Sequence, residues 1–423
     1  MMYDVAVVGA GPGGLMAAKT AAEQGLKAVV IEKRRDVSTI TRACCEQFIM
    51  DENYSGDTIR VEQGKVLFTK NGFSVDYSGP LMNVTDKYYY SPGARRIHFA
   101  NEDKSPIVIK FDKGRLLGGL WEQCETAGVA LKPETVVYDL SDTGEKVDLS
   151  VTCRGCHDII SARKVIAADG VNTGAAEALG LNKTRRHFAT ALCIVYYMAG
   201  MEDFEPTALK TYFGRSYQGL APIMIGPAIE DESVGYVICT GNAKYPPPQI
   251  FENVTKNGAL APVFKNARLV KKVGCTLKTF TPLQVPWQGN SLVIGDAAAY
   301  VEVETQGALM CGYHAARAVK KELSGEEGFN DYTRWWQDSF EFIGDDFMRV
   351  AQGFALVPTY SDDELDYLFG LVEDEVLEGT YNQYKSPKVM WDAILQHREK
   401  IAQERPELYE TITGKQVSLS DML

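Results

Sequence analysis

The first thirty residues follow a strand, helix and strand pattern. Residues 3–8 form an apolar run that predicts a buried strand, and residues 15–24 are rich in alanine and predict a helix that Gly25 ends. Residues 27–32 predict the next strand. A unit of about 30 residues in this order is typical of the opening of a parallel sheet with a right-handed crossover.

The pattern changes after this unit. Residues 61–109 contain short β-branched and aromatic runs broken by Gly, Pro and Asn, which predicts an antiparallel excursion. Residues 115–127 have apolar positions at helical spacing, and Gly128 ends this predicted helix. A small sheet is expected within residues 135–161, followed by a return strand at residues 164–168.

The second half of the chain divides into two patterns. Residues 187–288 have strand-like runs with few helical periods, which predicts a largely antiparallel sheet. After residue 294 the pattern is helical to the end of the chain. The whole chain is therefore expected to be an α/β protein with more than one domain.

Composition indicates a soluble globular protein. Hydrophobic residues make up 45% and charged residues 24%, both close to ordinary averages. The net charge of -12, without a long basic block, argues against nucleic acid as a partner. No stretch reaches the roughly 20 apolar residues that a membrane helix needs, which leaves only peripheral membrane contact open.

The location is expected to be cytoplasmic. Residues 5–18 are apolar but contain four glycines and follow no basic leader, which argues against a signal peptide. Nine cysteines, an odd number spread along a long chain, fit reduced thiols better than disulfides.

Gly9, Gly11 and Gly14 form a G-x-G-x-x-G motif between the first predicted strand and helix, and Glu32 ends the next strand. In a dinucleotide-binding unit the first glycine allows the turn, the second lets the diphosphate approach, and the third lets helix and strand pack closely. The acidic residue then binds a ribose hydroxyl. A glycine-rich turn without a ligand is disfavoured, because the strand, helix and acidic residue are all in register.

Gly295 and Asp296 indicate which dinucleotide is bound. They follow a Ser-Leu-Val-Ile strand and open the helical tail, as a second cofactor contact would. Here the chain resembles the flavoprotein superfamily that includes the p-hydroxybenzoate hydroxylases and the geranylgeranyl reductases. In that superfamily a late Gly-Asp carboxylate binds the flavin ribityl chain. A middle Asp-Gly, matched here by Asp169 and Gly170, lies beside the cofactor. The resemblance implies non-covalent FAD.

Within this superfamily the chain is most similar to geranylgeranyl reductases and related flavoprotein dehydrogenases, over about residues 3–340. The motifs that carry the likeness are Glu32-Lys33-Arg34, Cys44-Cys45-Glu46, Arg115 at a helix start, and Tyr212-Phe213-Gly214 before a Tyr-x-x-x-x-Pro. The implied cofactor contacts are Gly9, Gly11, Gly14, Glu32, Lys33, Arg42, Arg115, Val137, Asp169, Gly295, Asp296, Gly307 and Ala308.

The resemblance also implies a domain plan. The expected fold is a Rossmann-like FAD-binding domain with an antiparallel β-sheet substrate domain and a helical C-terminal region. The expected boundaries are residues 1–180 for the FAD domain, with the excursion near 61–109; 181–289 for the substrate domain; 290–330 for a return to the flavin; and 331–423 for the helical region.

Two segments depart from the reductase pattern. Gly219 and Ala221 follow Tyr217 where the reductases carry aromatic residues of a lipid pocket. The loop after Gly-Asp normally holds a proline and paired glycines, whereas this chain has carboxylates at Glu302 and Glu304. We expect these two carboxylates to lie close to the reaction, and Glu304 and Tyr217 are candidate catalytic residues.

Cys44, Cys45 and Cys311 fall in the two segments that the resemblance places beside the isoalloxazine, so a redox or proton-donating role is a candidate for each. The simpler alternative is a buried thiol that only packs. Cys153 and Cys156 spell part of a haem attachment sequence, but their place between two strands predicts a hairpin turn with a cross-strand thiol pair. One such pair does not complete a zinc site, so no metal is expected.

These features favour an FAD-dependent reductase or dehydrogenase that acts on a carbon–carbon bond of an apolar prenyl or acyl substrate, with hydride transfer at flavin N5. The chain has no second G-x-G-x-x-G motif, so the electron donor is not identified. The alternatives are an aromatic-type monooxygenase and a flavin electron carrier that docks a protein partner.

Overall fold

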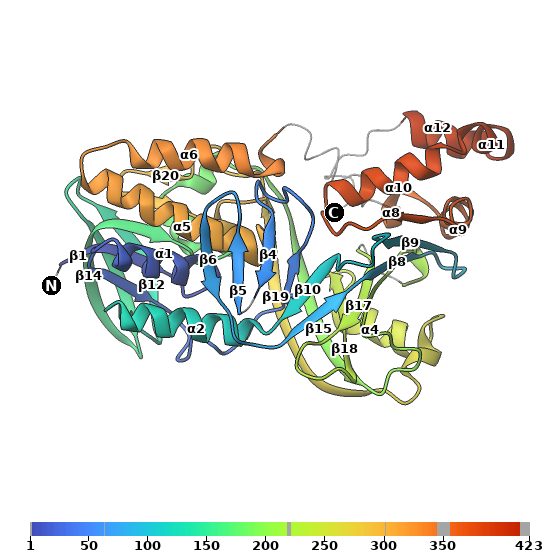
Figure 1. Ribbon diagram of the computed structural model, residues 1–423, viewed down its shortest axis with the longest axis horizontal. Helices are drawn as coiled ribbons and strands as arrows, with labels where there is room; N and C mark the ends of the chain where they lie inside the picture. Colours follow the sequence, from blue (N-terminus) through green and yellow to red (C-terminus); the bar gives the residue numbers. More distant parts are fainter. Residues whose placement is uncertain (1, 63, 218–220, 301, 345–355, 415–423) are drawn as a thin grey trace.

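The computed structural model of the chain describes residues 2–62, 64–217, 221–300, 302–344 and 356–414. Two large sheets lie side by side in it (Figure 1), and the N-terminal and C-terminal halves of the chain both contribute to each. The long strands β15 (His187–Ala199) and β19 (Arg268–Phe280) run between the two parts of the molecule.

The first sheet is built on a parallel core. Its strand order is β11-β2-β1-β14-β13-β12, and β21 pairs with both β14 and β20. Strand β1 lies between β2 and β14 and is parallel to both. The bounds are β1 Met2–Val8, β2 Ala28–Ile31, β11 Ala130–Lys132, β12 Thr135–Asp142, β13 Val147–Cys153, β14 Cys156–Ala167, β20 Trp287–Gln288 and β21 Ser291–Val293.

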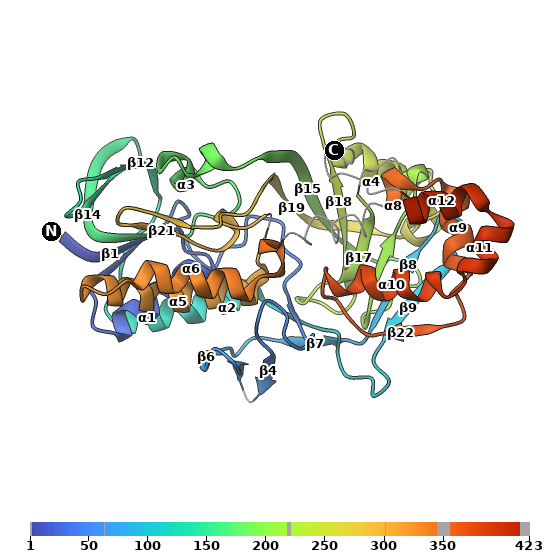
Figure 2. The ribbon, with the colours of Figure 1, turned by 90° about the horizontal axis from the view of Figure 1, so that it is seen from above.

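Four helices lie on one face of this sheet (Figure 2): α1 Pro12–Glu23, α2 Lys113–Thr126, α5 Glu304–Leu323 and α6 Gly328–Ser339. Helix α1 begins with Pro12. Proline is favourable at this first position, because the N–H that it lacks would have no hydrogen-bond partner within the helix. Helices α1 and α5 pack closely because glycines meet there: a Cβ on Gly312 would lie 2.2 Å from the carbonyl oxygen of Gly13. This approach brings the start of α5 beside the glycine turn.

The second large sheet has the order β19-β15-β18-β17-β16-β8-β9-β22. Its pairs are antiparallel except for β16 with β8 and β22 with β9, which are parallel. The bounds not yet given are β8 Asp86–Tyr90, β9 Arg96–Ala100, β16 Ala208–Tyr212, β17 Ile223–Pro227, β18 Val234–Gly241 and β22 Val376–Glu378.

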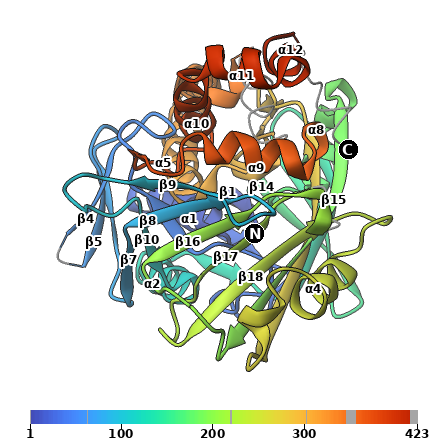
Figure 3. The same cartoon turned by 90° about the vertical axis from the view of Figure 1, so that its right-hand side faces the viewer.

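Helices cover both faces of the second sheet. Figure 3 shows α4 (Pro247–Lys256) on one side and the C-terminal helices on the other. The C-terminal helices share a core with buried side chains of β8 and β9, among them Tyr89 and Phe99. Their bounds are α8 Leu356–Thr359, α9 Asp362–Gly370, α10 Lys385–Leu395, α11 Arg398–Glu404 and α12 Pro406–Gly414.

Two three-stranded antiparallel sheets complete the strands: β3-β10-β7 and β4-β5-β6. Their bounds are β3 Gln47–Ile49, β4 Ile59–Glu62, β5 Lys65–Phe68, β6 Phe73–Asp76, β7 Leu81–Val84 and β10 Val108–Phe111. The short helices are α3 Gly174–Ala178, η1 Leu181–Thr184, η2 Arg215–Tyr217, η3 Ala261–Phe264, η4 Gly295–Ala297 and η5 Glu341–Ile343.

The expected α/β class, the opening strand–helix–strand unit and the mainly antiparallel second sheet are confirmed. The predicted hairpin is also present, because Cys153 and Cys156 are partners across the turn.

Two local expectations were wrong. Strand β14 is a single strand rather than two, because its first half pairs with β13 and its second half with β21. The C-terminal region is not wholly helical, since β22 adds an edge strand. Strands β8 and β9, within the range 1–180, pair into the second sheet. The domain boundaries stay a prediction.

Candidate functional site

The glycine turn after β1 has the shape that a diphosphate needs. Gly9 has a φ of +99°, and a Cβ there would lie 2.5 Å from the carbonyl oxygen of Ala168. A Cβ on Gly14 would lie 1.9 Å from the carbonyl oxygen of Gly9. Gly11, in contrast, is the N-cap residue of α1 and has open space beside it. A Cβ on Gly11 would meet no described atom within 4 Å. The first N–H groups of α1 therefore form a cradle for an anion beside Gly11.

Glu32 closes this cradle at the end of β2. Its buried carboxylate accepts hydrogen bonds from the N–H of Ala10, at 2.7 Å, and from the backbone and side chain of Arg34, at 2.8 and 3.0 Å. Burial alone would favour the neutral acid, but Arg34 and Ala10 lower the pKa of Glu32 below its ordinary value. Glu32 is thus a fixed negative acceptor at the position where a ribose is expected. Lys33 beside it points to the surface.

Asp169, two residues after the end of β14, has one carboxylate oxygen without a partner among the described residues. Its Oδ2 accepts hydrogen bonds from the N–H groups of Gly174 and Ala175, at 2.8 and 3.0 Å, at the start of α3. Its Oδ1 is buried and has no partner among the described residues. Burial raises the pKa of Asp169 above its ordinary value. A buried polar atom without a partner is costly, so this oxygen is suited to a polar group of a bound cofactor.

Arg42 and Asp296 come together from segments far apart in the sequence. Asp296 Oδ1 accepts a hydrogen bond from the N–H of Val303 at 3.0 Å, and its Oδ2 lies 3.8 Å from Nη1 of Arg42. A Cβ on Gly170 would lie 3.2 Å from the same nitrogen. Gly295 has a φ of +65°, which favours glycine at this bend. The structure therefore brings four predicted positions, Arg42, Asp169, Gly295 and Asp296, to one edge of the first sheet.

Two carboxyl groups follow Asp296. Glu304 begins α5 with a φ of 58°, a left-handed conformation that costs free energy in a residue other than glycine. Desolvation, together with the charges of Glu302 and Asp296, raises the pKa of Glu304 well above its ordinary value. Desolvation and Asp296 also raise the pKa of Glu302, although solvent reaches its side chain. Glu304 is therefore easier to protonate than an ordinary glutamate.

Cys44 and Cys45 lie in the loop between β2 and β3, which we call the cysteine loop, near these carboxyl groups. Cys44 Sγ accepts hydrogen bonds from Nζ of Lys113 at 3.3 Å and from the N–H of Glu46 at 3.4 Å. Burial, followed by the charge of Glu304, raises the pKa of Cys45 well above its ordinary value. The two thiols thus have different surroundings: a cation contacts Cys44, whereas Cys45 is held neutral.

Cys311 lies elsewhere, in the middle of α5. It is fully buried, and burial raises its pKa to about 12. Its interaction partners are the hydroxyl of Tyr332 on α6 and the backbone of Gly295. These surroundings fit a packing role for Cys311, and its candidate redox or proton-donating role stays a prediction.

Other predicted residues lie apart from this edge. Tyr217 is buried with Tyr212 against the α4 side of the second sheet, whereas Cys45 packs against the opposite face. Gly219 lies outside the described residues. Val137 is half-buried in β12, beside a bulge in its pairing with β13. The structure does not bring Tyr217 together with the cysteine loop.

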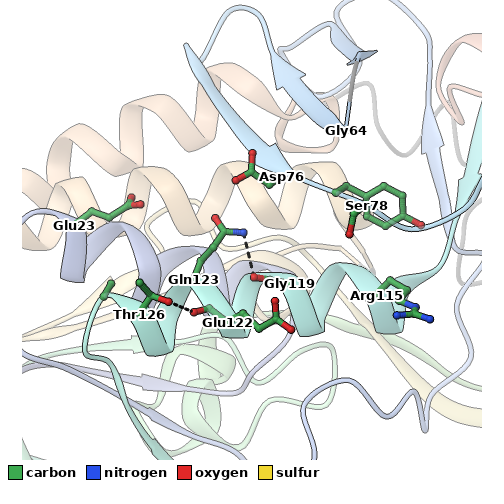
Figure 4. A pocket seen from close by; sticks show the side chains of 11 residues that line it. Glu23, Gly64, Asp76, Ser78, Arg115, Gly119, Glu122, Gln123 and Thr126 are labelled. Atoms are coloured by element: carbon green, nitrogen blue, oxygen red, sulfur yellow. Dashed lines mark hydrogen bonds between the residues drawn. The ribbon is translucent and has the colours of Figure 1, made fainter.

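Arg115 lines a separate pocket. Its side chain is exposed in the first turn of α2, and its backbone N–H donates a hydrogen bond to the side chain of Asp112, which caps the helix. Figure 4 shows this pocket between α2 and the strand β6, with Asp76, Glu122 and Gln123 among its lining residues. Its volume is about 560 Å³. A cofactor contact at Arg115 remains an expectation.

Gly307 and Ala308 act through helix packing. A Cβ on Gly307 would lie 3.0 Å from Val303 and 3.1 Å from Phe340, and the carbonyl oxygen of Ala308 lies 2.9 Å from a Cβ built on Gly13. Both residues hold the first turns of α5 against their neighbours, which sets the place of Glu304.

Several residues of this region carry no motif and were not predicted. Gln306 binds both backbone groups of Ile49 in β3, at 2.8 and 3.1 Å. Lys110 is buried, donates a hydrogen bond to the carbonyl of Cys45, and lies 4.6 Å from the ring of Tyr236. Lysine and glutamine carry no local signal for such roles, because the contacts depend on tertiary packing.

Within the described ranges, no group of three or more His, Cys, Asp or Glu side chains is placed to hold a metal ion. In the same part of the chain, none of the helices combines the length and the apolar character needed to cross a membrane.

Comparisons with known proteins agree with this geometry. The model of one family, described as FAD binding domain, matches residues 2–305. A digeranylgeranylglycerophospholipid reductase of Methanocaldococcus jannaschii is 27% identical over 87% of this chain and 90% of that protein. The enzyme of the same name from Methanococcus vannielii is 29% identical over 89% of this chain and 92% of that protein.

Solved structures share the fold. A geranylgeranyl bacteriochlorophyll reductase-like protein from Thermoplasma acidophilum superimposes with a TM-score of 0.73, at 20% identity, over 96% of this chain and 99% of that one. A p-nitrophenol 4-monooxygenase from Pseudomonas putida superimposes with a TM-score of 0.65, at 12% identity, over 98% and 99% of the two chains.

The open cradle at Gly11, the acceptor at Glu32 and the unpartnered oxygen of Asp169 all fit FAD. The expected FAD cofactor and the likeness to geranylgeranyl reductases are confirmed. This chain belongs to the FAD binding domain family and is an FAD-dependent oxidoreductase.

Proposed function

We propose that this protein reduces carbon–carbon double bonds in the prenyl chains of a lipid. The observation that carries the proposal is its similarity, over 87% of the chain, to an enzyme named digeranylgeranylglycerophospholipid reductase. Reduction of a double bond requires a hydride and a proton. FAD supplies hydride chemistry when it is bound. The proton must then come from the protein or from water.

Glu304 is the proposed source of that proton. Its raised pKa makes the carboxyl group easier to protonate, and a general acid must carry its proton before it acts. Its electrostatic partners include the half-buried Cys45 and the buried Tyr54. Arg42 and Asp296 hold the loop before it through their ion pair. The chain thus offers a proton on a carboxyl group whose backbone is fixed at the start of α5.

The proposal is tested with the holoenzyme, reduced anaerobically and mixed with a geranylgeranyl-bearing glycerophospholipid. We expect each reduced double bond to add two hydrogens to the mass of the lipid. Glu304→Gln should slow this conversion by about 100-fold, the usual range for loss of a general acid. Glu102→Gln, at an exposed position on the loop after β9, is the matched control and should leave the rate unchanged.

An unchanged lipid mass with the wild-type enzyme would contradict the proposed reaction. A fully active Glu304→Gln variant would contradict only the role of Glu304. The unfolding temperature of each variant shows whether a loss of rate reflects loss of the fold.

One observation favours a second function. The face of the second sheet toward the cysteine loop carries Tyr197 and Tyr236, and the buried hydroxyl of Tyr236 has no partner among the described residues. A hydroxyl of this kind suits a polar aromatic substrate better than a saturated chain. A monooxygenase reaction would consume oxygen in step with a phenolic substrate, without any gain of hydrogen by the lipid.

A further inference from the structure

Cys193 and Cys275 face each other across two neighbouring strands of the second sheet. They are directly opposite in the antiparallel pairing of β15 with β19. Both belong to the core cluster that also contains Ala43 and Cys45 of the cysteine loop, so their side chains lie on the same face. Opposite residues in such a pair have Cα atoms roughly 4.5–5.5 Å apart, within the range of about 4.4–6.8 Å for disulfides. Both are free thiols in the structure.

The two sulfurs are in different states. The thiol of Cys193 donates a hydrogen bond to the sulfur of Cys275, and Arg42 contacts that same sulfur with its charge and a hydrogen bond. The hydrogen bond from Cys193, followed by the charge of Arg42, lowers the pKa of Cys275 to about 6 despite burial. The same hydrogen bond raises the pKa of Cys193. Cys275 is therefore the thiol of the pair that loses its proton more readily, and Cys193 holds its proton more tightly.

The neighbours of the pair are defined. Thr240, opposite Cys193 in β18, hydrogen-bonds the sulfur of Cys193. Arg42, which contacts Cys275, also interacts with Asp296 and Glu302. The pair therefore joins the second sheet to the loop that carries the predicted flavin contacts.

We propose that Cys193 and Cys275 are a redox-active pair that exchanges with low-molecular-weight disulfides. The thiolate of Cys275 attacks one sulfur of glutathione disulfide, so that a mixed disulfide forms and one glutathione leaves as a thiolate. Cys193 then loses its proton and attacks the sulfur of Cys275. The second glutathione leaves, and a disulfide joins Cys193 to Cys275. Two protein thiols are oxidised, and one glutathione disulfide is reduced to two thiols.

Closure of this disulfide changes the charges around Arg42. The thiolate of Cys275 is one of its negative partners, and that charge is lost on oxidation. Arg42 then keeps Asp296 and Glu302 as its negative partners. Its pairing with the loop after β21 becomes stronger, because Cys275 no longer competes for its charge. Oxidation of the two thiols in the second sheet thereby changes the ion pairing of Arg42 and Asp296, two of the predicted flavin contacts.

The test uses the wild-type holoenzyme and needs no substitution for its first step. At pH 7, limited treatment with iodoacetamide should label Cys275 more than about tenfold faster than the buried Cys239, because the thiolate is the reacting form. Treatment with glutathione disulfide should remove two hydrogens from the protein mass, and peptide mapping should recover a Cys193–Cys275 peptide. A reducing agent should restore the thiols. Equal labelling, or a disulfide at other cysteines only, would overturn the proposal.

Variants then distinguish the attacking role of Cys275 from the resolving role of Cys193. Cys193→Ser should stop the reaction at one bound glutathione on Cys275, and Cys275→Ser should bind none in this sheet. A Cys153→Ser, Cys156→Ser double variant removes the other facing pair, in the exposed hairpin, and should still form the Cys193–Cys275 disulfide. If Cys193→Ser formed the intramolecular disulfide with another cysteine just as fast, Cys193 would not be the resolving residue.

Discussion

At Gly11 and Gly14 the same added methyl group meets two different surroundings. A Cβ on Gly11 has open space around it, and the φ of -78° is ordinary for alanine. Gly11→Ala should therefore keep the stability of the apoprotein but weaken FAD binding at least about tenfold, because the methyl group occupies the approach of the diphosphate. Gly14→Ala should destabilise the fold itself by about 3 kcal/mol, since its Cβ would lie 1.9 Å from a carbonyl oxygen. Flavin titration and chemical unfolding measure the two effects.

Gly119→Ala is the matched control for these variants. Gly119 lies inside α2, where a Cβ meets no described atom within 4 Å. Alanine there should stabilise the fold by about 0.5–1 kcal/mol and leave flavin binding unchanged. Unaltered flavin affinity in Gly11→Ala would argue against the assignment of the diphosphate cradle.

The residues of this site differ in how well the neighbouring sequence identifies them. The glycine turn, Glu32, Asp169 and Asp296 could be predicted because each is tied to a strand end in its own sequence neighbourhood. Cys193 and Cys275 could not, since they are 82 residues apart in the sequence and meet only through the register of β15 and β19. A shift of that register by one residue would place one of them on the opposite face.

At the scale of elements, Gln306 joins helix α5 to strand β3. Its side chain satisfies both the N–H and the carbonyl of Ile49, and all of these groups are buried. Gln306→Met keeps the side-chain volume but leaves both backbone groups without a partner. We expect a loss of about 2–4 kcal/mol in the free energy of unfolding, measured by denaturant titration. The start of α5 should also loosen, so hydrogen exchange around Glu304 should become faster.

Gln337→Met tests whether loss of any glutamine has this effect. Gln337 makes one hydrogen bond of 2.8 Å to the carbonyl of Gln284, at an exposed position in α6. Its removal should cost less than about 1 kcal/mol. Equal losses in the free energy of unfolding for the two variants would mean that the hydrogen bonds between β3 and α5 stabilise the fold no more than an exposed one.

Elements with local signals could be predicted, and those that depend on distant partners could not. The opening unit and α2 have clear periodicity and glycine stops, and both were found close to their observed bounds. Strand β14 was predicted as two strands, one that ends at residue 161 and one that begins at residue 164. It is continuous because β13 and β21 pair in turn with its two halves. Strand β22 has only three residues and exists through its pairing with β9.

At the scale of the whole molecule, the buried Lys87 and the half-buried Asp51 hold the C-terminal segment to the rest. Lys87 in β8 donates hydrogen bonds to the carbonyl of Thr380, at 2.5 Å, and to Ser386 Oγ, at 2.8 Å. Asp51, after β3, accepts hydrogen bonds from the side chain of Thr380 and from the N–H of Tyr381, the latter at 2.9 Å. The segment before α10 is therefore tied both to the second sheet and to the strand that follows the cysteine loop.

This arrangement predicts a particular pH dependence of stability. Desolvation lowers the pKa of Lys87 to about 7, although the charge of Asp51 opposes the shift. Between about pH 7 and 10 the unfolded chain binds a proton at Lys87 that the folded chain does not. The contribution of Lys87 to stability therefore rises with pH in this window, by up to about 1.4 kcal/mol per pH unit. Below pH 7 both states are protonated, and the burial of the charged lysine is fully penalised.

Lys87→Met removes this titration, while the other titrating groups remain common to both proteins. The free energies of unfolding, measured in denaturant at pH 7, 8 and 9, should therefore diverge, with the wild type gaining on the variant as the pH rises. Lys256→Met is the control, because Lys256 is exposed on α4 and pairs only with Glu252 four residues earlier. Its curve should run parallel to that of the wild type. Parallel curves for Lys87→Met as well would mean that Lys87 stays protonated in the fold, with its charge balanced by Asp51 and the surrounding aromatic rings.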